Sequence, residues 1–149
     1  MQRSTYFDGI LAPLVGPSDW RAALDLEPGT DIPSYETGTW TPTVTSGSGS
    51  FTTVSATGTY VKLSRMVQFW ITIVITDAGT ASGILEASLP YTNEAAVRSI
   101  SGFEGQTTLF ALSAWVASGD DLARCLKYDG TGIIASSRQV FLAGAFRTA

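Results

Sequence analysis

The strongest pattern in the chain is an alternation of apolar and other residues between positions 66 and 76. Val67, Phe69, Ile71, Ile73 and Ile75 recur at every second residue, which places them on one face of a pleated strand. The residues between them are half polar, and β-branched or aromatic side chains fill most positions, as in a half-buried strand. A helix of the same residues would be apolar on all sides. We therefore predict a strand with one buried face.

A further strand is predicted on each side of this central one. Residues 57–63 alternate in the same way, and the two residues that follow are enough to close a hairpin with the central strand. A glycine-rich turn comes next, followed by a strand over residues 84–92 that Pro90 ends. The pattern predicts a three-strand meander over residues 57–92.

Shorter strands are predicted around the meander. Residues 39–45 alternate and contain Pro42, which has no backbone N–H, so they should form an edge strand or a strand start. Residues 46–56 form a flexible loop or a second edge segment. Residues 107–118 are apolar on both faces, which predicts a central strand or one at a subunit interface. The other predicted strands cover residues 97–103, 122–128 and 136–146. In the last of these, Val140, Leu142 and Phe146 share one face, and Phe141 takes the other.

These seven or eight strands, separated by glycine-rich turns, predict an all-β fold. The expected architecture is an antiparallel β-sandwich, jelly-roll-like, over residues 39–149. Residues 1–38 should form a separate part that consists of an N-terminal arm, one short helix and a linker. Ser18 is the expected N-cap of that helix, and Asp19 suits the positive helix end.

The arm, residues 1–16, is too apolar for a disordered tail, and its glycines and prolines prevent a long helix. We expect an extended segment that becomes ordered against something else. The alternative is that its apolar residues cap the chain's own core. The apolar side chains in question are Tyr6, Phe7, Ile10, Leu11, Leu14 and Val15.

Composition narrows the possible functions. Charged residues make up only 15% of the 149 residues, below the roughly 25% usual for soluble domains, so we expect part of the surface to be buried against copies of the same chain. The net charge of −4 belongs to residues 1–38, since residues 39–149 hold seven basic and seven acidic side chains. An acidic chain without a basic stripe does not favour a nucleic-acid partner. No run of 18 apolar residues predicts a membrane span.

Catalytic and metal chemistry are disfavoured by the residue types. The chain has no histidine, and its single cysteine, Cys125, excludes an intrachain disulfide and a cysteine-based metal cluster. Without histidine a conventional Ser-His-Asp nucleophile is excluded. Glu86 and Glu104 are the only pair that we considered for glycosidase chemistry, and nothing in the sequence places them together. We predict that the protein is not an enzyme and has no cofactor or metal.

Three short motifs, in this order, resemble the C-terminal knob domains of phage head fibres and tail fibres, preceded by a short collar helix. A G-x-W-x-P motif comes first, a G-x-Y-x-K motif with a following V-x-F comes second, and a closing L-P comes third. The chain departs from the pattern at Ser64, where glycine is usual. The resemblance covers roughly residues 18–92. The matching positions are Gly38, Trp40 and Pro42, then Gly58, Tyr60, Lys62, Val67 and Phe69, then Leu89 and Pro90.

The resemblance implies a homotrimeric virion fibre or spike, made in the host cytoplasm and displayed on the virion surface at the capsid or tail. It implies that the N-terminal arm attaches to other virion proteins and that the β tip contacts host surface glycans. Two alternatives stay open. The chain is a purely structural decoration or adaptor protein, or it is a free carbohydrate-binding module, which has no use for an apolar arm.

Aromatic side chains are the candidates for sugar binding, because a flat ring stacks on the apolar face of a pyranose. Trp70 is the foremost, since it lies between Gln68 and Thr72 in sequence order on the more polar face of the central strand. The alternative is that the rings pack in the core or at a trimer axis. Asp120, Asp121 and Asp129 were considered for a cation and are better explained as solvated turn residues. The candidate rings are Trp40, Trp70, Tyr91 and Trp115.

Overall fold

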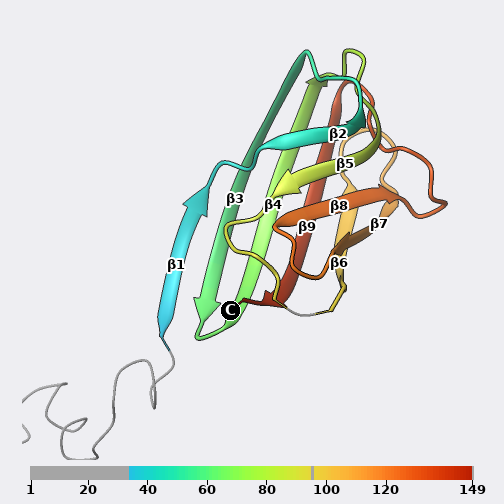
Figure 1. Cartoon of the computed structure of the whole chain (residues 1–149). Helices are drawn as coiled ribbons and strands as arrows, with labels where there is room; N and C mark the ends of the chain where they lie inside the picture. The colour runs from blue at the N-terminus through green and yellow to red at the C-terminus, as the bar shows by residue number, and fades with distance from the viewer. Residues whose placement is uncertain (1–33, 95, 149) are drawn as a thin grey trace, which may run out of the picture. The chain divides into compact units, whose positions relative to one another are not determined.

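The computed structural model describes residues 34–94 and 96–148, and in this part the chain forms nine strands and no helix (Figure 1). All of them lie in the unit Tyr35–Ala149. Every pairing between neighbouring strands is antiparallel. The predicted all-β, antiparallel class is therefore confirmed. The strands are β1 (Tyr35–Trp40), β2 (Val44–Ser48), β3 (Thr53–Leu63), β4 (Met66–Asp77), β5 (Ser82–Ser88), β6 (Arg98–Glu104), β7 (Ala111–Val116), β8 (Leu122–Lys127) and β9 (Arg138–Arg147).

The predicted helix near Ser18 and the predicted arm lie outside the described residues. The expected boundary at residue 38 falls inside β1, which already begins at Tyr35, so the last residues of the expected linker are strand. The single strand expected over residues 39–45 is wrong, because β1 ends at Trp40 and β2 begins at Val44. Pro42 lies between them, where it disrupts no backbone ladder.

The hairpin of β3 and β4 is confirmed. The strands pair along almost their full length, from Thr53 opposite Asp77 to Leu63 opposite Met66. Ser64 makes the turn with a left-handed backbone, φ 54°, a conformation that glycine adopts without steric cost. The turn therefore forms without the glycine usual at this position in the family that the motifs resemble.

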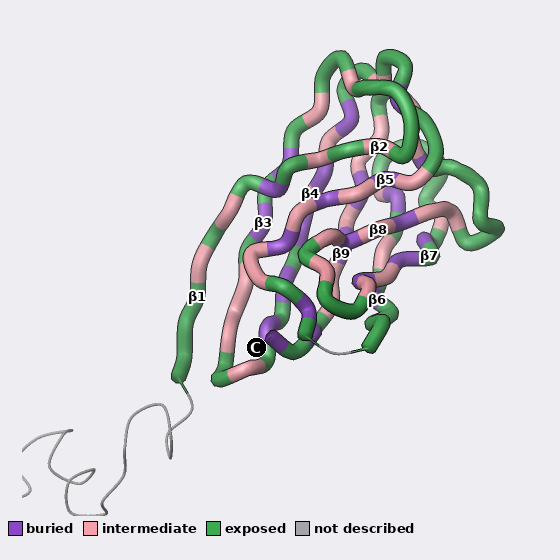
Figure 2. Tube along the Cα trace, in the orientation of Figure 1, coloured by how far each residue is buried: buried purple, intermediate pink, exposed green. Residues whose placement is uncertain are grey.

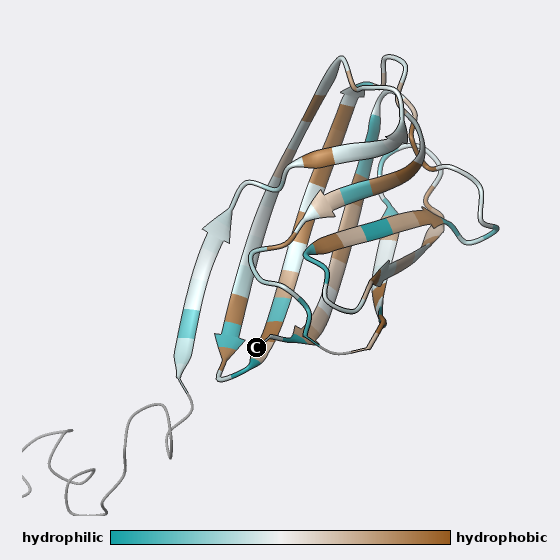
Figure 3. Cartoon of the chain, viewed as in Figure 1, coloured by the Kyte–Doolittle hydropathy of each residue, from teal (hydrophilic) through white to brown (hydrophobic). Residues whose placement is uncertain are grey.

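The predicted faces of β4 are also confirmed. Val67, Phe69, Ile71, Ile73 and Ile75 are all buried, with at most 2% of each residue exposed. The alternate positions are exposed or half-buried. Figure 2 shows this as alternating burial along β4, and Figure 3 shows the matching alternation of hydropathy. Alternation in the sequence was sufficient here because side chains of a strand point to opposite faces in turn.

The order of strands across the sheet is β1-β3-β4-β9-β6-β7-β8-β5-β2. The predicted meander is wrong in its third strand, because β5 pairs with β8 and β2 and not with β4. β4 pairs instead with β9, the last strand of the chain. Residues 78–81 thus carry the chain from one part of the sheet to another. The local pattern predicted a strand here, which runs over Ser82–Ser88 and not over residues 84–92, but long-range contacts specified its partners.

The sheet curls, so that β2, β5 and β8 lie across from β3, β4 and β9 (Figure 1). A single apolar cluster fills the interior. Phe69 and Phe146 meet in it with ring centroids 5.8 Å apart. Besides the five residues of β4, it contains buried side chains of β5, β7, β8 and β9, among them Leu85, Val116, Cys125, Val140 and Leu142.

Among the strands after residue 97, β7 is shorter than predicted, because it runs over Ala111–Val116 and not over residues 107–118. β6, β8 and β9 differ from the predicted ranges by one or two residues at their ends. β7 lies between β6 and β8, as expected for a central strand. Residues 39–45 were expected at an edge of the sheet. They belong in part to β1 and in part to β2, and these two strands are the edges of the sheet.

Candidate binding surfaces

Trp70 lies on the side of β4 that faces away from the core, with 43% of the residue exposed. It borders a groove of about 430 Å³ whose floor and walls come from β4, β9 and β6. Across the groove, the rings of Phe103 and Phe141 are stacked with centroids 4.8 Å apart and planes at 21°. The small side chain of Ala143 lies directly opposite Trp70, and this leaves the space between the aromatic rings. No charged residue lines the groove.

Sequence reasoning named Trp70 but missed Phe103 and Phe141. Phe141 was correctly placed on the face opposite to Val140 and Leu142, yet its stacking partner comes from β6. The two phenylalanines meet because β6 and β9, distant in sequence, are neighbours in the sheet. Local alternation gave the face of Phe141 and gave no signal of its pairing with Phe103.

Trp115 is on the same outward side of the sheet, on β7, and lies opposite Ser99 of β6 and Arg124 of β8. It does not line the groove that Trp70 borders. Three strand spacings separate β4 from β7, or about 14 Å at ~4.8 Å each. The two tryptophans therefore share a face of the sheet without forming one aromatic platform.

Trp40 lies on the other side of the sheet, where it packs against the core. Its indole N–H donates a hydrogen bond of 2.9 Å to the carbonyl of Ser88. Trp40 is paired with Gly58, and a Cβ on Gly58 would lie 2.6 Å from the indole ring. Gly38 is paired with Tyr60, and a Cβ there would lie 2.6 Å from the phenol ring. The aromatic ring on each of these two strands thus covers a glycine on the other strand.

Tyr91 belongs to the same cluster as Trp40. Its ring meets Tyr60 edge-on at 5.4 Å, and the ammonium of Lys62 lies 4.8 Å from its centroid. The hydroxyls of Tyr60 and Tyr91 donate to one oxygen of Glu36, at 2.5 and 2.7 Å. These hydrogen bonds lower the pKa of the Glu36 carboxyl, and the bond from Tyr60 has the larger effect. The hydrogen bonds of Tyr91 with Tyr60 and Glu36 raise the pKa of the Tyr91 hydroxyl. The cluster fastens the edge strand β1 to β3 and to the segment after β5.

The four candidate rings are therefore divided between two places. Trp70 and Trp115 lie on the outward side of the sheet, whereas Trp40 and Tyr91 join the cluster that holds β1. Sugar binding by these residues stays a prediction.

Glu104, at the end of β6, is fully buried. One carboxylate oxygen accepts hydrogen bonds from the backbone N–H groups of Gln106 (3.0 Å) and Thr107 (2.8 Å). The other accepts from the Thr108 N–H (2.7 Å), the Thr108 hydroxyl (2.9 Å) and the Leu109 N–H (3.2 Å). Burial raises the pKa of this carboxyl, but the hydrogen bonds lower it more, so that the pKa falls from 4.5 to about 2.

The carboxylate of Glu104 thus fixes the loop between β6 and β7. In this loop Leu109 has a left-handed backbone, φ 51°, and is 75% exposed. The Thr107 hydroxyl also donates to the carbonyl of Ser137, which has φ 60°. Sequence reasoning weighed Glu104 only as a carboxylate for glycosidase chemistry, and the glycine and threonines that follow it were the available signal for a loop cap.

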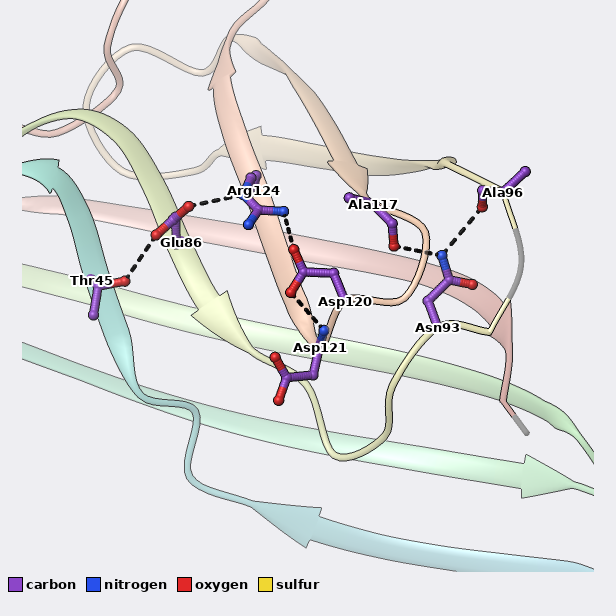
Figure 4. A network of polar contacts seen from close by, with 8 residues as sticks. All are labelled: Thr45, Glu86, Asn93, Ala96, Ala117, Asp120, Asp121 and Arg124. Atoms are coloured by element: carbon purple, nitrogen blue, oxygen red, sulfur yellow. Dashed lines mark hydrogen bonds and ion pairs between the residues drawn. The ribbon is translucent and has the colours of Figure 1, made fainter.

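Glu86 has a different role from Glu104. It lies on the outward side of β5, where it accepts from the Arg124 guanidinium at 2.9 Å and from the Thr45 hydroxyl at 3.3 Å (Figure 4). Asp120 binds the same guanidinium at 2.6 Å. Among the candidate turn aspartates, the Asp129 carboxylate accepts from the N–H and hydroxyl of Thr131. Within residues 34–94 and 96–148, no three acidic, cysteine or histidine side chains form a group that could hold a metal.

Cys125 is fully buried in the core, and burial raises the pKa of its thiol to about 12. The thiol is therefore protonated at neutral pH and shielded from reagents. The proposed attachment residues, from Tyr6 to Val15, lie outside the described residues. In the part of the chain that the structure describes, no helix has the length and hydrophobicity needed to cross a membrane.

Comparison of the chain with protein-family models, with curated proteins and with solved structures gives no match.

Proposed function

We propose that this chain is a virion structural protein, a homotrimeric fibre or spike component that attaches to a phage or phage-like particle through its N-terminal arm and contacts the host surface with its β unit. The observation that carries the proposal is that the motif residues of the resemblance interlock. Gly38 lies under Tyr60, and Gly58 lies under Trp40. If the two motifs were assembled by chance, there would be no reason for the glycine of each to be covered by the aromatic residue of the other.

The closing L-P of the resemblance belongs to the same cluster. It follows Ser88, whose carbonyl accepts the Trp40 N–H, while the Leu89 N–H donates to the carbonyl of Asp121 at 2.6 Å. The jelly-roll-like sandwich remains part of the proposal. The curling of the sheet around one core supports it, because two opposed sets of strands then cover a common interior.

The test of virion location is immunoelectron microscopy of particles purified from a culture that makes the protein. We expect label on the capsid or tail surface. A protein found only in the soluble fraction, with unlabelled particles, would contradict the proposal.

A deletion of residues 1–16 tests the arm. We expect the shortened protein to fold and self-associate but to be absent from purified particles. If it fails to fold or to self-associate, the arm belongs to the core and the assignment is wrong. The wild-type protein, made in parallel and recovered on particles, is the control. Competition by purified protein against particle adsorption to cells then separates a host-contacting fibre from a purely structural adaptor, which would not compete.

A free carbohydrate-binding module is the second candidate, and the groove beside Trp70 is the observation that favours it. An uncharged groove with aromatic walls suits a neutral sugar ring. Binding to a glycan array, lost on Trp70→Ala and retained on Trp115→Ala, would support this function. Because Trp115 does not line the groove, equal loss in both variants would contradict a site there.

A further inference from the structure

The six strands β1, β3, β4, β9, β6 and β7 are consecutive neighbours in the sheet and share one outward side. Their inward residues are those of the core, such as Ile71 and Leu142, so their outward residues are the alternate positions. We call these outward residues the outer face. Because residues directly opposite in paired strands point to the same side, the register extends this assignment to β1, where Thr39 lies opposite Thr59 of β3.

The outer face lacks charge almost completely. Arg147, the last residue of β9, is its only charged side chain. All the others are serine, threonine, glutamine, small apolar or large apolar residues. A sheet face that meets water normally alternates with charged and polar residues that keep the molecule soluble. Such a wide uncharged area therefore needs an explanation.

The outward sides of β5 and β8 do carry charged residues, so the lack of charge is specific to the outer face. On β5 and β8, Glu86 and Arg124 point outward and form an ion pair, which Asp120 extends (Figure 4). The same sheet thus carries a half-buried charged network on the outward side of one part and none on that of the other. Low charge in the whole chain does not account for this difference, because the shorter strands β5 and β8 carry outward charges while the longer strands β3 and β4 carry none.

Large apolar residues are also concentrated on the outer face. Trp70 is 43% exposed, Phe103 50% and Met66 54%. The groove between Trp70 and the stacked phenylalanines is a depression in the outer face, and side chains of another surface can fill it. Depletion of charge together with enrichment of aromatic residues and methionine is the composition of the core of a protein–protein interface.

The area is sufficient for a stable interface. The six strands contain 6, 11, 12, 10, 7 and 6 residues. At ~3.3 Å per residue and ~4.8 Å between strands, they cover about 800 Å². A standard-size interface buries roughly 800 Å² of each partner. A single sugar ring in the groove would leave most of this area exposed.

We propose that the outer face packs against other copies of this chain. A charged partner would find no opposite charge on the outer face. A second copy of the same uncharged face needs none, because the two faces can associate by burial of apolar area alone. This inference rests on the self-association in the proposed function and adds the surface through which it occurs. The inference places Trp70 and Trp115 at a subunit interface. This was the alternative to sugar binding for these rings.

The test introduces charge on the outer face of the full chain. Thr59→Lys on β3 and Ser101→Lys on β6 alter exposed positions, and Ser82→Lys, at an exposed position of β5, is the matched control. Mass is measured by light scattering, and folding by circular dichroism. We expect both outer-face variants to fall to the 15.7 kDa of a single chain with an unchanged β spectrum, while the control keeps the wild-type mass.

An oligomeric wild type whose outer-face variants keep the same mass would overturn this inference and leave the proposed homotrimer standing. A monomeric wild type would overturn both. Hydroxyl-radical footprinting of the wild-type protein provides a second measurement that needs no variant. We expect Trp70 and Phe103 to be protected and to become reactive on dilution, with Tyr128, 72% exposed and outside the outer face, reactive throughout. Equal reactivity of all three at every concentration would also overturn the inference.

Discussion

The buried carboxylate of Glu104 provides the sharpest test of the structure. In Glu104→Gln the shape of the side chain is kept, but one accepting oxygen becomes an NH₂ group. That group would face three donors, the N–H groups of Thr108 and Leu109 and the Thr108 hydroxyl, or the amide would turn and face the other two. In either orientation buried N–H groups lose their acceptor, which costs stability because they have no water to replace it.

The magnitude follows from the pKa. A fall in the pKa of the Glu104 carboxyl from 4.5 to about 2 means that its ionised form is favoured in the folded protein. At 1.36 kcal/mol for each pKa unit, the ionised carboxyl contributes about 3 kcal/mol to the free energy of unfolding at pH 7. The folded pKa is the lower one, so this contribution is complete above pH 4.5 and is lost as the pH falls from 4.5 through 2. At pH 3 roughly 1.5 kcal/mol remains.

Urea unfolding, followed by tryptophan fluorescence at pH 7 and pH 3, measures this directly. We expect Glu104→Gln to be about 3 kcal/mol less stable than wild type at pH 7, and the difference to shrink by roughly half at pH 3. Other carboxyls titrate in both proteins and cancel in the difference. Glu94→Gln is the control, because its exposed ion pair with Arg65 should be worth less than about 1 kcal/mol. A Glu104→Gln protein as stable as wild type, or a deficit that is independent of pH, would refute the reasoning.

Three further variants test other parts of the fold by the same unfolding measurement. Gly58→Ala should cost about 1–3 kcal/mol, because its Cβ would lie 2.6 Å from the Trp40 ring; no loss would show that the ring does not cover the glycine. Ser64→Gly should leave the stability unchanged or raise it, whereas Ser64→Val should lower it by about 1–2 kcal/mol, because the φ at this turn is 54°; the reverse order would contradict the turn. Ile71→Asp should prevent folding, since a buried unpaired carboxylate costs several kcal/mol; a soluble native protein would contradict the face assigned to β4.

The sequence was informative for features that depend on a single strand or on two strands joined by a short turn. The alternation from Val67 to Ile75 gave the buried face of β4, and the spacing before Met66 gave its hairpin with β3. The alternation around Val140 gave the core face of β9 in the same way. These features depend on the two-residue period of a strand and on a short link, both of which are local.

Pairing between distant strands was not predictable by this reasoning. A strand was predicted at β5, yet it lies beside β8 and β2 and not beside β4, because any partner that helps to enclose the same core can bury an apolar face. The stacking of Phe103 on Phe141 and the assembly of Glu36, Tyr60 and Tyr91 follow from such pairings.

The candidate site was predicted only in part for the same reason. Trp70 was placed on the correct side of its strand, but the groove beside it needs β9 and β6 as neighbours. Trp40 was a candidate for sugar binding with core packing as the alternative. The structure shows core packing, because the ring covers Gly58 and its N–H donates to the Ser88 carbonyl, neither of which the sequence reveals. The role of Glu104 also depends on a loop geometry that only coordinates specify.

The mass of the full-length protein in solution, measured by multi-angle light scattering, is the most direct test of the central claim. We predict a value near three times the 15.7 kDa of one chain at the highest concentration measured. A value of 15.7 kDa at every concentration would contradict the homotrimeric fibre and leave the single-chain carbohydrate-binding module as the better explanation.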